Sequence, residues 1–209
     1  MSLTAWVRRA RTPEPAPVRR EIAVFEPADL FDIDIKDDPE ASPVLCCTDD
    51  PAGAAAFNAL WLKRIATSGR YAAAVSVRGQ GGTPAAEGGV EAFTHDVVQA
   101  AVTVPRQAVL IGHREGAAWA ALAAGRYPAA GLVLVSPQRF PKQPPKPVGG
   151  PPILLVVSES EAQSKEAQAV TEAYGTAPLT FAGSPDEVFK GAAAEGILDA
   201  VLSWLDGKK

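Results

Sequence analysis

Short apolar runs alternate with segments of helical periodicity along most of the chain. Apolar runs bounded by turn residues are typical of buried strands, and apolar residues three and four positions apart are typical of helices that cover a sheet. The pattern predicts strands over 21–25, 30–36, 43–48, 71–77, 107–111, 131–136, 153–157 and 179–182. Such alternation favours an α/β fold with a mostly parallel, twisted sheet and helices on both faces.

The predicted helices connect these strands and close the chain. They lie around Phe57–Ile65 and Phe93–Ala101, over 117–126 and 161–174, and around Ile197–Leu205. Gly69 ends the first of them and Gly175 the fourth, as glycine does where a helix needs a left-handed last residue. We expect three aromatic residues on these helices to pack against the sheet: Trp61, Trp119 and Trp204.

Two segments fall outside the alternation. Residues 137–152 contain seven prolines, which excludes a helix and predicts an extended connector. Residues 1–20 carry five arginines and one glutamate, a net charge of +4 that leaves −8 on the remainder. We therefore divide the chain into a basic, proline-rich arm over 1–20 and a single domain over 21–209, with 137–152 as its connector.

Composition excludes several classes of protein. The 209 residues are 47% hydrophobic, enough for a sizeable core, but no apolar run reaches the length of a transmembrane helix. The two cysteines, Cys46 and Cys47, are neighbours and do not form a disulfide framework, which favours a reducing intracellular compartment over secretion. The cytoplasm and an organellar matrix, such as that of mitochondria, both fit. An acidic chain without interleaved basic and aromatic residues is also a poor nucleic-acid binder.

The stretch from Tyr71 to Pro137 resembles the α/β-hydrolase superfamily. It contains, in the order of that family, VSVRGQGGT, VLIGHREGAAWAALAAGRYP and GLVLVSP. The likeness continues more faintly through ILLVVSESEAQS and FAGSPDEVF, and covers roughly residues 21–206. The resemblance implies an α/β-hydrolase fold, in which the connector stands where many relatives insert a lid domain.

The resemblance also locates the turn that carries the nucleophile, a G-x-S-x-G elbow between a strand and a helix. Here the turn reads Gly112, His113, Arg114, Glu115, Gly116, so the glycines are kept and the nucleophile position holds Arg114. A guanidinium stays protonated at working pH and is no nucleophile. We interpret His113 as a structural histidine and Glu115 as an acid that complements the helix dipole.

The other catalytic positions are degenerate as well. The loop that carries the histidine base in the family reads Gly183-Ser184-Pro185-Asp186, and His95 is expected at an exposed helix position. Asp49 and Asp50 stand where relatives often have an oxyanion-binding His-Gly pair, and Asp50 fits a helix start. Glu161, or its neighbour Glu159, is a remnant of the catalytic acid at most.

These losses predict a pseudoenzyme without cofactor or metal, not an enzyme. It would serve as a structural or accessory subunit, or interaction module, of a larger and possibly organellar assembly of other protein subunits. The basic arm also suits an anionic membrane surface. Two alternatives stay open: a pocket in which Arg114 binds an anionic small molecule, and a hydrolase that uses an atypical nucleophile such as Cys47. The expected contact residues are Trp6, Arg8, Arg9, Arg11, Arg139, Lys142 and Lys146.

Overall fold

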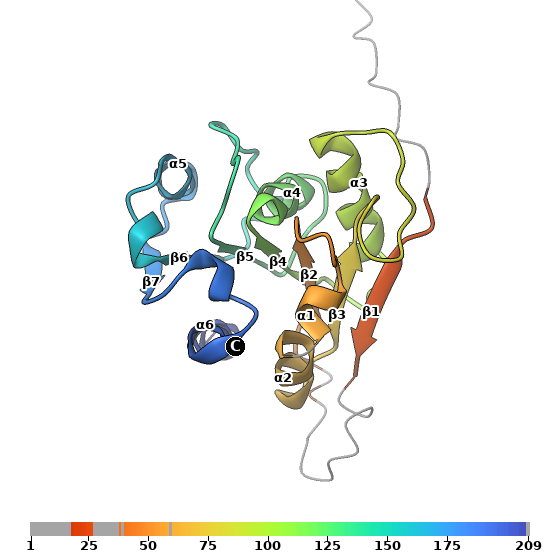
Figure 1. Cartoon of the computed structure of the whole chain (residues 1–209), viewed down its shortest axis with the longest axis horizontal. Helices are drawn as coiled ribbons and strands as arrows, with labels where there is room; N and C mark the ends of the chain where they lie inside the picture. The colour runs from red at the N-terminus through yellow and green to blue at the C-terminus, as the bar shows by residue number, and fades with distance from the viewer. Residues whose placement is uncertain (1–17, 27–37, 39, 59, 208–209) are drawn as a thin grey trace, which may run out of the picture.

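One seven-stranded sheet organises the molecule (Figure 1). The computed structural model describes residues 18–26, 38, 40–58 and 60–207. The strand order is β1-β3-β2-β4-β5-β6-β7, with β1 antiparallel to β3 and the other neighbours parallel. This arrangement confirms the predicted fold class. The strands are β1 Glu21–Phe25, β2 Val44–Thr48, β3 Ala72–Ser76, β4 Val109–His113, β5 Gly131–Val135, β6 Ile153–Ser158 and β7 Pro178–Phe181.

Helices cover both faces of the sheet (Figure 1). One face packs against α3 Val90–Ala101, α4 Glu115–Ala124 and α5 Lys165–Tyr174. The other packs against α1 Ala55–Asn58, α2 Trp61–Thr67 and α6 Gly191–Asp206. The central strands β2 to β5 are buried on both faces, as parallel strands between two helical layers must be.

The predicted helices differ from the observed ones at two places. The helix expected around Phe57–Ile65 is split, because the backbone of Leu60 leaves the helical region at φ −129°. The helix expected from residue 161 begins at Lys165, since the Ser164 side chain accepts a hydrogen bond from the Ala167 N–H and caps it. Residues 159–161 form a separate 3₁₀ turn.

The connector runs from β5 to β6 without a helix or strand. It is held against the domain at several points: the Val148 N–H donates to the Ala124 carbonyl at 2.8 Å, and the Tyr174 hydroxyl donates to the Pro145 carbonyl at 3.3 Å. The segment is therefore a packed strip that leaves the carboxyl ends of the strands without a helical lid.

The described residues test the predicted positions of three tryptophans, but not the predicted arm. Trp61 and Trp119 are buried and Trp204 is partly buried in the helix–sheet cores, as predicted. The strand expected over 30–36, and most of the arm with Trp6, Arg8, Arg9 and Arg11, lie outside the described residues. Within the described part of the chain no helix is long and apolar enough to cross a membrane.

Candidate functional site

A sharp turn between β4 and α4 forms the centre of the candidate site. Arg114 lies at its apex with φ 56° and ψ −120°, and its N–H donates to the Val135 carbonyl of β5 at 3.0 Å. A Cβ on Gly112 would lie 2.3 Å from the Gly116 carbonyl oxygen, and one on Gly116 would lie 2.6 Å from the Cys47 carbonyl oxygen. Both positions therefore require glycine for steric reasons, and the backbone of the nucleophile elbow is intact.

The side chain at the apex is held by two carboxylates. Nη1 of Arg114 donates to Oδ1 of Asp186 at 2.9 Å, and its Nε lies 3.4 Å from Oδ1 of Asp49. Asp186 comes from the loop after β7, and Asp49 from the loop after β2. The side chain of Arg114 is 36% exposed, so the pairs are only partly shielded from water. An ion cluster thus occupies the positions at which the resemblance places nucleophile, base and oxyanion loop.

The pKa of Asp49 lies above its ordinary value. Burial raises the pKa of Asp49, and the neighbouring Arg114 cation acts against that shift. Asp50 instead uses its Oδ1 to accept from the Ala52 N–H at 2.8 Å, which starts the turn that leads into α1. Neither carboxylate is arranged to stabilise a developing oxyanion, since both repel negative charge.

His113 is 4% exposed and lines the elbow pocket together with Arg114. Its Nδ1 lies 3.0 Å from the Thr48 hydroxyl, and the Phe189 ring packs edge-on at 4.6 Å between centroids. Burial lowers the pKa of His113 to about 4, and the Arg114 cation acts in the same direction. The ring is therefore neutral at pH 7 and belongs to the packing between β4, β2 and the loop before α6.

His95 differs from the prediction. It is half-buried and not exposed, on the face of α3 that it shares with Glu91 and Gln99. It belongs to a helix before β4, whereas the base of the resemblance follows the last strand. The structure thus brings no imidazole from α3 into the lining of the elbow pocket.

The remnant acid has a local structural role. Oε2 of Glu161 accepts from the N–H and the hydroxyl of Ser158, at 3.2 and 3.1 Å, and so caps the turn after β6. Glu159 is exposed in the same turn. Glu115, at the first position of α4, pairs with Arg139 of the connector at 3.0 Å. None of these acids lines the pocket at the elbow.

Cys47 has the environment of an inert thiol. It is buried in β2, and its Sγ donates to the Gly116 carbonyl at 3.4 Å. Burial raises the pKa of Cys47 to about 12, so the nucleophilic thiolate is not populated near neutral pH.

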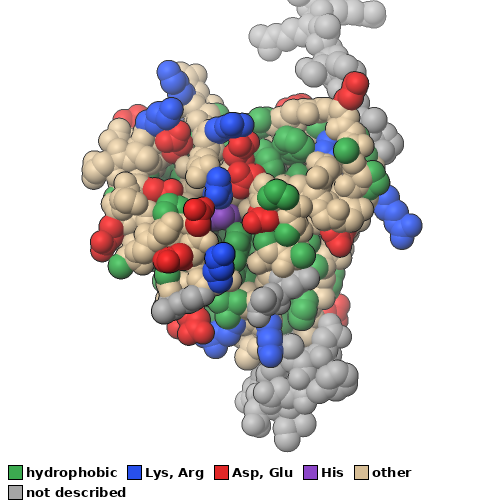
Figure 2. Space-filling view, in the orientation of Figure 1, with side chains coloured by type: hydrophobic (Ala, Val, Ile, Leu, Met, Phe, Trp, Pro, Cys, Tyr) green, Lys and Arg blue, Asp and Glu red, His purple; other side chains and the backbone are tan. Residues whose placement is uncertain are grey.

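A cavity of about 260 Å³ opens at the elbow. Figure 2 shows acidic and basic side chains gathered on the face where α4, α6 and α1 meet. The described lining contains no hydroxyl or thiol, the nucleophiles of serine and cysteine hydrolases. Sequence reasoning missed Phe189 and Lys190, because no motif marks them. The lining residues are Asp49, Asp50, Pro51, His113, Arg114, Asp186, Phe189 and Lys190.

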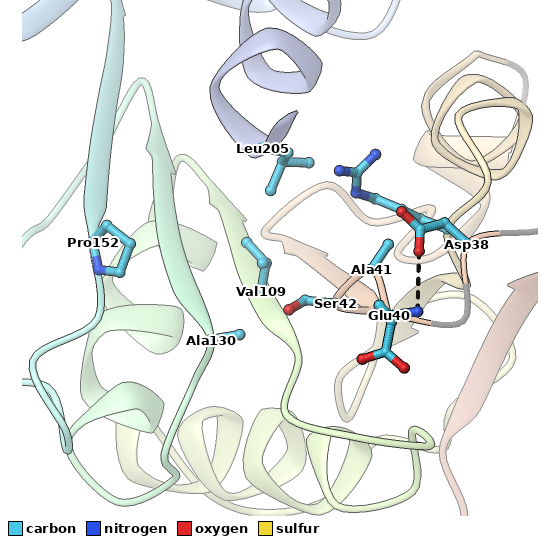
Figure 3. Close-up of a pocket in the computed structure, with 9 residues that line it drawn as sticks. Asp38, Glu40, Ala41, Ser42, Val109, Ala130, Pro152 and Leu205 are labelled. Carbon is cyan, nitrogen blue, oxygen red and sulfur yellow. Dashed lines mark hydrogen bonds between the residues drawn. The ribbon is translucent and has the colours of Figure 1, made fainter. Parts of the chain in front are cut away.

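A larger cavity of about 490 Å³ lies at the opposite edge, by the amino ends of the strands. Figure 3 shows it between the segment with Asp38 and Glu40 and the end of α6 at Leu205, with Val109 and Ala130 below. Arg70 also lines it and pairs with Asp206 at 2.8 Å. No cluster of potential metal ligands occurs in the described residues.

The ion pair between Arg114 and Asp186 could have been predicted from the sequence. The two residues are 72 positions apart, but Arg114 occupies the nucleophile position and Asp186 lies in the loop in which hydrolases of this pattern carry the base. In a chain with the strand order of an α/β-hydrolase, the side chains of the elbow and of this loop lie close together. Their opposite charges therefore indicate an ion pair.

The chain is similar to known proteins in its three-dimensional structure and not in its sequence. No protein-family model matches the chain, and no curated protein matches it by sequence. An enol-lactonase from Burkholderia xenovorans superposes with a TM-score of 0.71 at 11% identity, over 93% of this chain and 99% of the lactonase. An esterase from Thermogutta terrifontis gives 0.68 at 13% identity, over 94% and 96% of the two chains. A variant of an N-formylmaleamic acid deformylase from Pseudomonas putida gives 0.64 at 17% identity, over 90% and 98%. At such identities these likenesses show a shared fold and leave the chemistry to be argued from the residues of the site.

Proposed function

We propose that this chain, which has the α/β-hydrolase fold, is a non-catalytic protein that acts as an accessory subunit or interaction module of a larger assembly. The observation that carries the proposal is the ion cluster at the elbow. Arg114 stands at the apex of an intact nucleophile turn and pairs with Asp186 at 2.9 Å. A side chain that must attack a carbonyl has been replaced by one that holds two loops together.

The loss concerns several groups at once. A guanidinium has no reactive lone pair at working pH, and the described lining of the elbow pocket contains no hydroxyl for the Asp186 carboxylate to activate. Removing a single catalytic serine or histidine from a serine hydrolase lowers turnover by about 10⁶-fold. A chain that lacks the nucleophile and the base together is expected to show no turnover through this site.

The two alternative functions have less support. An anionic ligand would have to displace Asp49 or Asp186 from Arg114, or bind beside two carboxylates that already neutralise the guanidinium. A Cys47 nucleophile would need its thiol exposed and ionised, but burial disfavours both. The elbow pocket therefore favours neither an anion-binding module nor a cysteine hydrolase.

The accessory role is supported by what the chain keeps. The elbow glycines and both helix–sheet cores are intact, so the chain has what the fold requires without the nucleophile and base of a serine hydrolase. Fold alone does not fix function, and proteins of this kind work through their surfaces. The basic arm and the packed connector are the two segments that the hydrolase pattern does not require.

The test of inertness uses the purified wild-type chain and three substrate classes: a p-nitrophenyl ester, an acyl thioester and a peptide amide. We expect hydrolysis at the buffer rate and no labelling by a fluorophosphonate probe. Arg114→Ala and Cys47→Ala serve as matched variants that separate the site from contaminants. Turnover above background that disappears in either variant would refute the proposal.

The test of assembly is native-size separation of the chain from the cells that produce it. A non-catalytic subunit is expected to migrate well above the 21.7 kDa of its own mass. Migration only as a free monomer, at the protein concentration of the cell, would contradict the accessory role and leave the chain without a proposed partner.

A further inference from the structure

Buried polar atoms without a hydrogen bond gather at the elbow pocket, the cavity of about 260 Å³ described above. Among the described residues, five buried side-chain nitrogen or oxygen atoms have no hydrogen-bond partner, and three of them belong to residues that line this pocket. They are Oδ1 of Asp49, Nε of Arg114 and Nε2 of His113. Because an unpaired buried polar group costs free energy, three at one cavity indicate a polar ligand. We infer that the elbow pocket binds a primary carboxamide, a neutral group with a carbonyl acceptor and N–H donors.

Asp49 and Arg114 present an acceptor and a donor side by side. Oδ1 of Asp49 lies 3.4 Å from Nε of Arg114, so the two charges attract each other, but the N–H group does not have the direction of a hydrogen bond. Each atom can therefore still pair with a ligand. A carboxamide has its oxygen and its nitrogen on neighbouring positions of one plane, so it can accept from Nε while it donates to Oδ1.

His113 supplies a second donor to the same pocket. The Thr48 hydroxyl accepts from the Asp50 N–H at 3.2 Å and lies 3.0 Å from Nδ1 of His113. A hydroxyl in this arrangement donates to Nδ1, which assigns the ring proton to Nε2. Burial lowers the pKa of His113 more than the nearby Pro185 backbone raises it, and Nε2 makes no hydrogen bond of normal geometry with that backbone. The Nε2–H group therefore suits the second lone pair of the carboxamide oxygen.

The charges of the lining favour a neutral ligand. Carboxylates and cations occur together in it, as Asp49, Asp50, Asp186, Arg114 and Lys190. An anion is repelled by the carboxylates and a cation by the guanidinium and ammonium groups, whereas a neutral polar group avoids both repulsions. Pro51 and Phe189 add apolar surface to the lining, which suits a carboxamide attached to a flat apolar body.

The experiment compares benzamide, acetophenone and benzoate as ligands of the purified full chain at pH 7, by saturation-transfer difference NMR. At about 30 Å³ for each non-hydrogen atom, the pocket holds about nine such atoms, the size of these three molecules. They have the same ring and carbonyl group and differ only in the amide nitrogen, methyl group or second oxygen attached to it. The comparison therefore isolates the N–H donors and the charge of the ligand.

We expect benzamide to bind, and acetophenone and benzoate to bind about tenfold more weakly. Acetophenone leaves Oδ1 of Asp49 without a donor, and benzoate brings a further negative charge to Asp49 and Asp186. Equal binding of the three molecules, or no binding of benzamide, overturns the inference and assigns these hydrogen bonds to water. Release of benzoate from benzamide would overturn the proposed non-catalytic function and leave the binding inference in place.

Two variants test the named atoms. Asp49→Ala removes the acceptor and is expected to weaken benzamide binding about tenfold. Lys190→Ala is the matched control, because Lys190 is an exposed residue of the same lining and contributes none of the three atoms. It should change the affinity by less than about twofold, and an equal loss in both variants overturns the inference. Far-UV circular dichroism checks the fold, and the comparison of the three molecules on the wild type does not depend on either variant.

A last arm identifies the source of the carboxamide, which is a free small molecule or the asparagine or glutamine side chain of a partner protein. The tagged wild type and both variants are purified from the native cells and analysed by native mass spectrometry. A small bound mass that is lost from Asp49→Ala alone supports the first source, and a companion protein lost in the same way supports the second. If no bound species distinguishes Asp49→Ala from the wild type, the inference is overturned.

Discussion

At the scale of single residues, the buried His113 beside the elbow apex couples folding stability to pH. Its ring is buried against Thr48 and Phe189, and burial lowers its pKa to about 4 from an ordinary value of 6.5. In the unfolded chain the imidazole takes up a proton as the pH falls through 6.5, whereas in the folded chain it does so only near 4. Folding stability from this group is therefore complete above pH 6.5 and is lost as the pH falls toward 4.

The pH dependence can be measured by urea unfolding at pH 7 and pH 4. We expect the wild type to lose about 3 kcal/mol more stability over this interval than His113→Gln does, since the glutamine cannot titrate. His95→Gln is the control and should keep the wild-type difference, because His113 is still present. Equal pH dependence in the wild type and His113→Gln would show that the buried ring does not govern this transition.

At the scale of elements, a buried charge cluster attaches β1 to the rest of the sheet. Asp96 of α3 accepts from Arg20, just before β1, at 3.0 Å and from Arg78, after β3, at 2.9 Å. Burial alone would raise the pKa of Asp96, but the hydrogen bonds from Arg78 and Arg20 outweigh it and lower the pKa. One carboxylate thereby links a helix, a loop and the antiparallel edge strand.

Replacing that carboxylate tests the cluster. Asp96→Asn leaves the buried Arg78 cation without its counter-charge and is expected to lower the free energy of unfolding by about 3 to 5 kcal/mol. Asp199→Asn is the matched control, since its pair with Arg64 is exposed and should change stability by less than about 0.5 kcal/mol. Similar small effects for both variants would show that the β1 attachment relies on the strand pairing alone.

At the scale of the whole molecule, two hydrophobic cores share one sheet. Neighbouring residues of β2 point into different cores: Leu45 and Cys47 into the core of α3, α4 and α5, and Val44 and Cys46 into that of α1, α2 and α6. Trp119 belongs to the first core and Trp61 to the second. Because every central strand contributes to both, neither core can form without the sheet that supports the other.

This coupling predicts a single unfolding transition. Two variants, each with only Trp61 or only Trp119 as fluorophore and phenylalanine at the other tryptophans, report on one core each. In both variants the fluorescence midpoint in urea should coincide with that of far-UV circular dichroism. A fluorescence transition that precedes the loss of secondary structure in one variant would show that its core melts separately.

The sequence by itself determined the fold class and the residues that stand at the elbow. Both follow from local information: hydrophobic periodicity marks strands and helices, and the spacing of Gly112 and Gly116 marks the turn at which Arg114 stands. The same information placed the connector, because prolines exclude a helix wherever they cluster.

Only the tertiary structure decided which side chains meet at the elbow. The order of the strands brings the loops after β2, β4 and β7 to one edge, and so places Asp49 and Asp186 beside Arg114. The half-buried position of His95 and the capping role of Glu161 also depend on neighbours that local patterns do not specify. Contacts between residues far apart along the chain arise from strand order and packing. Hydrophobic periodicity describes only a few neighbouring residues at a time and therefore does not predict such contacts.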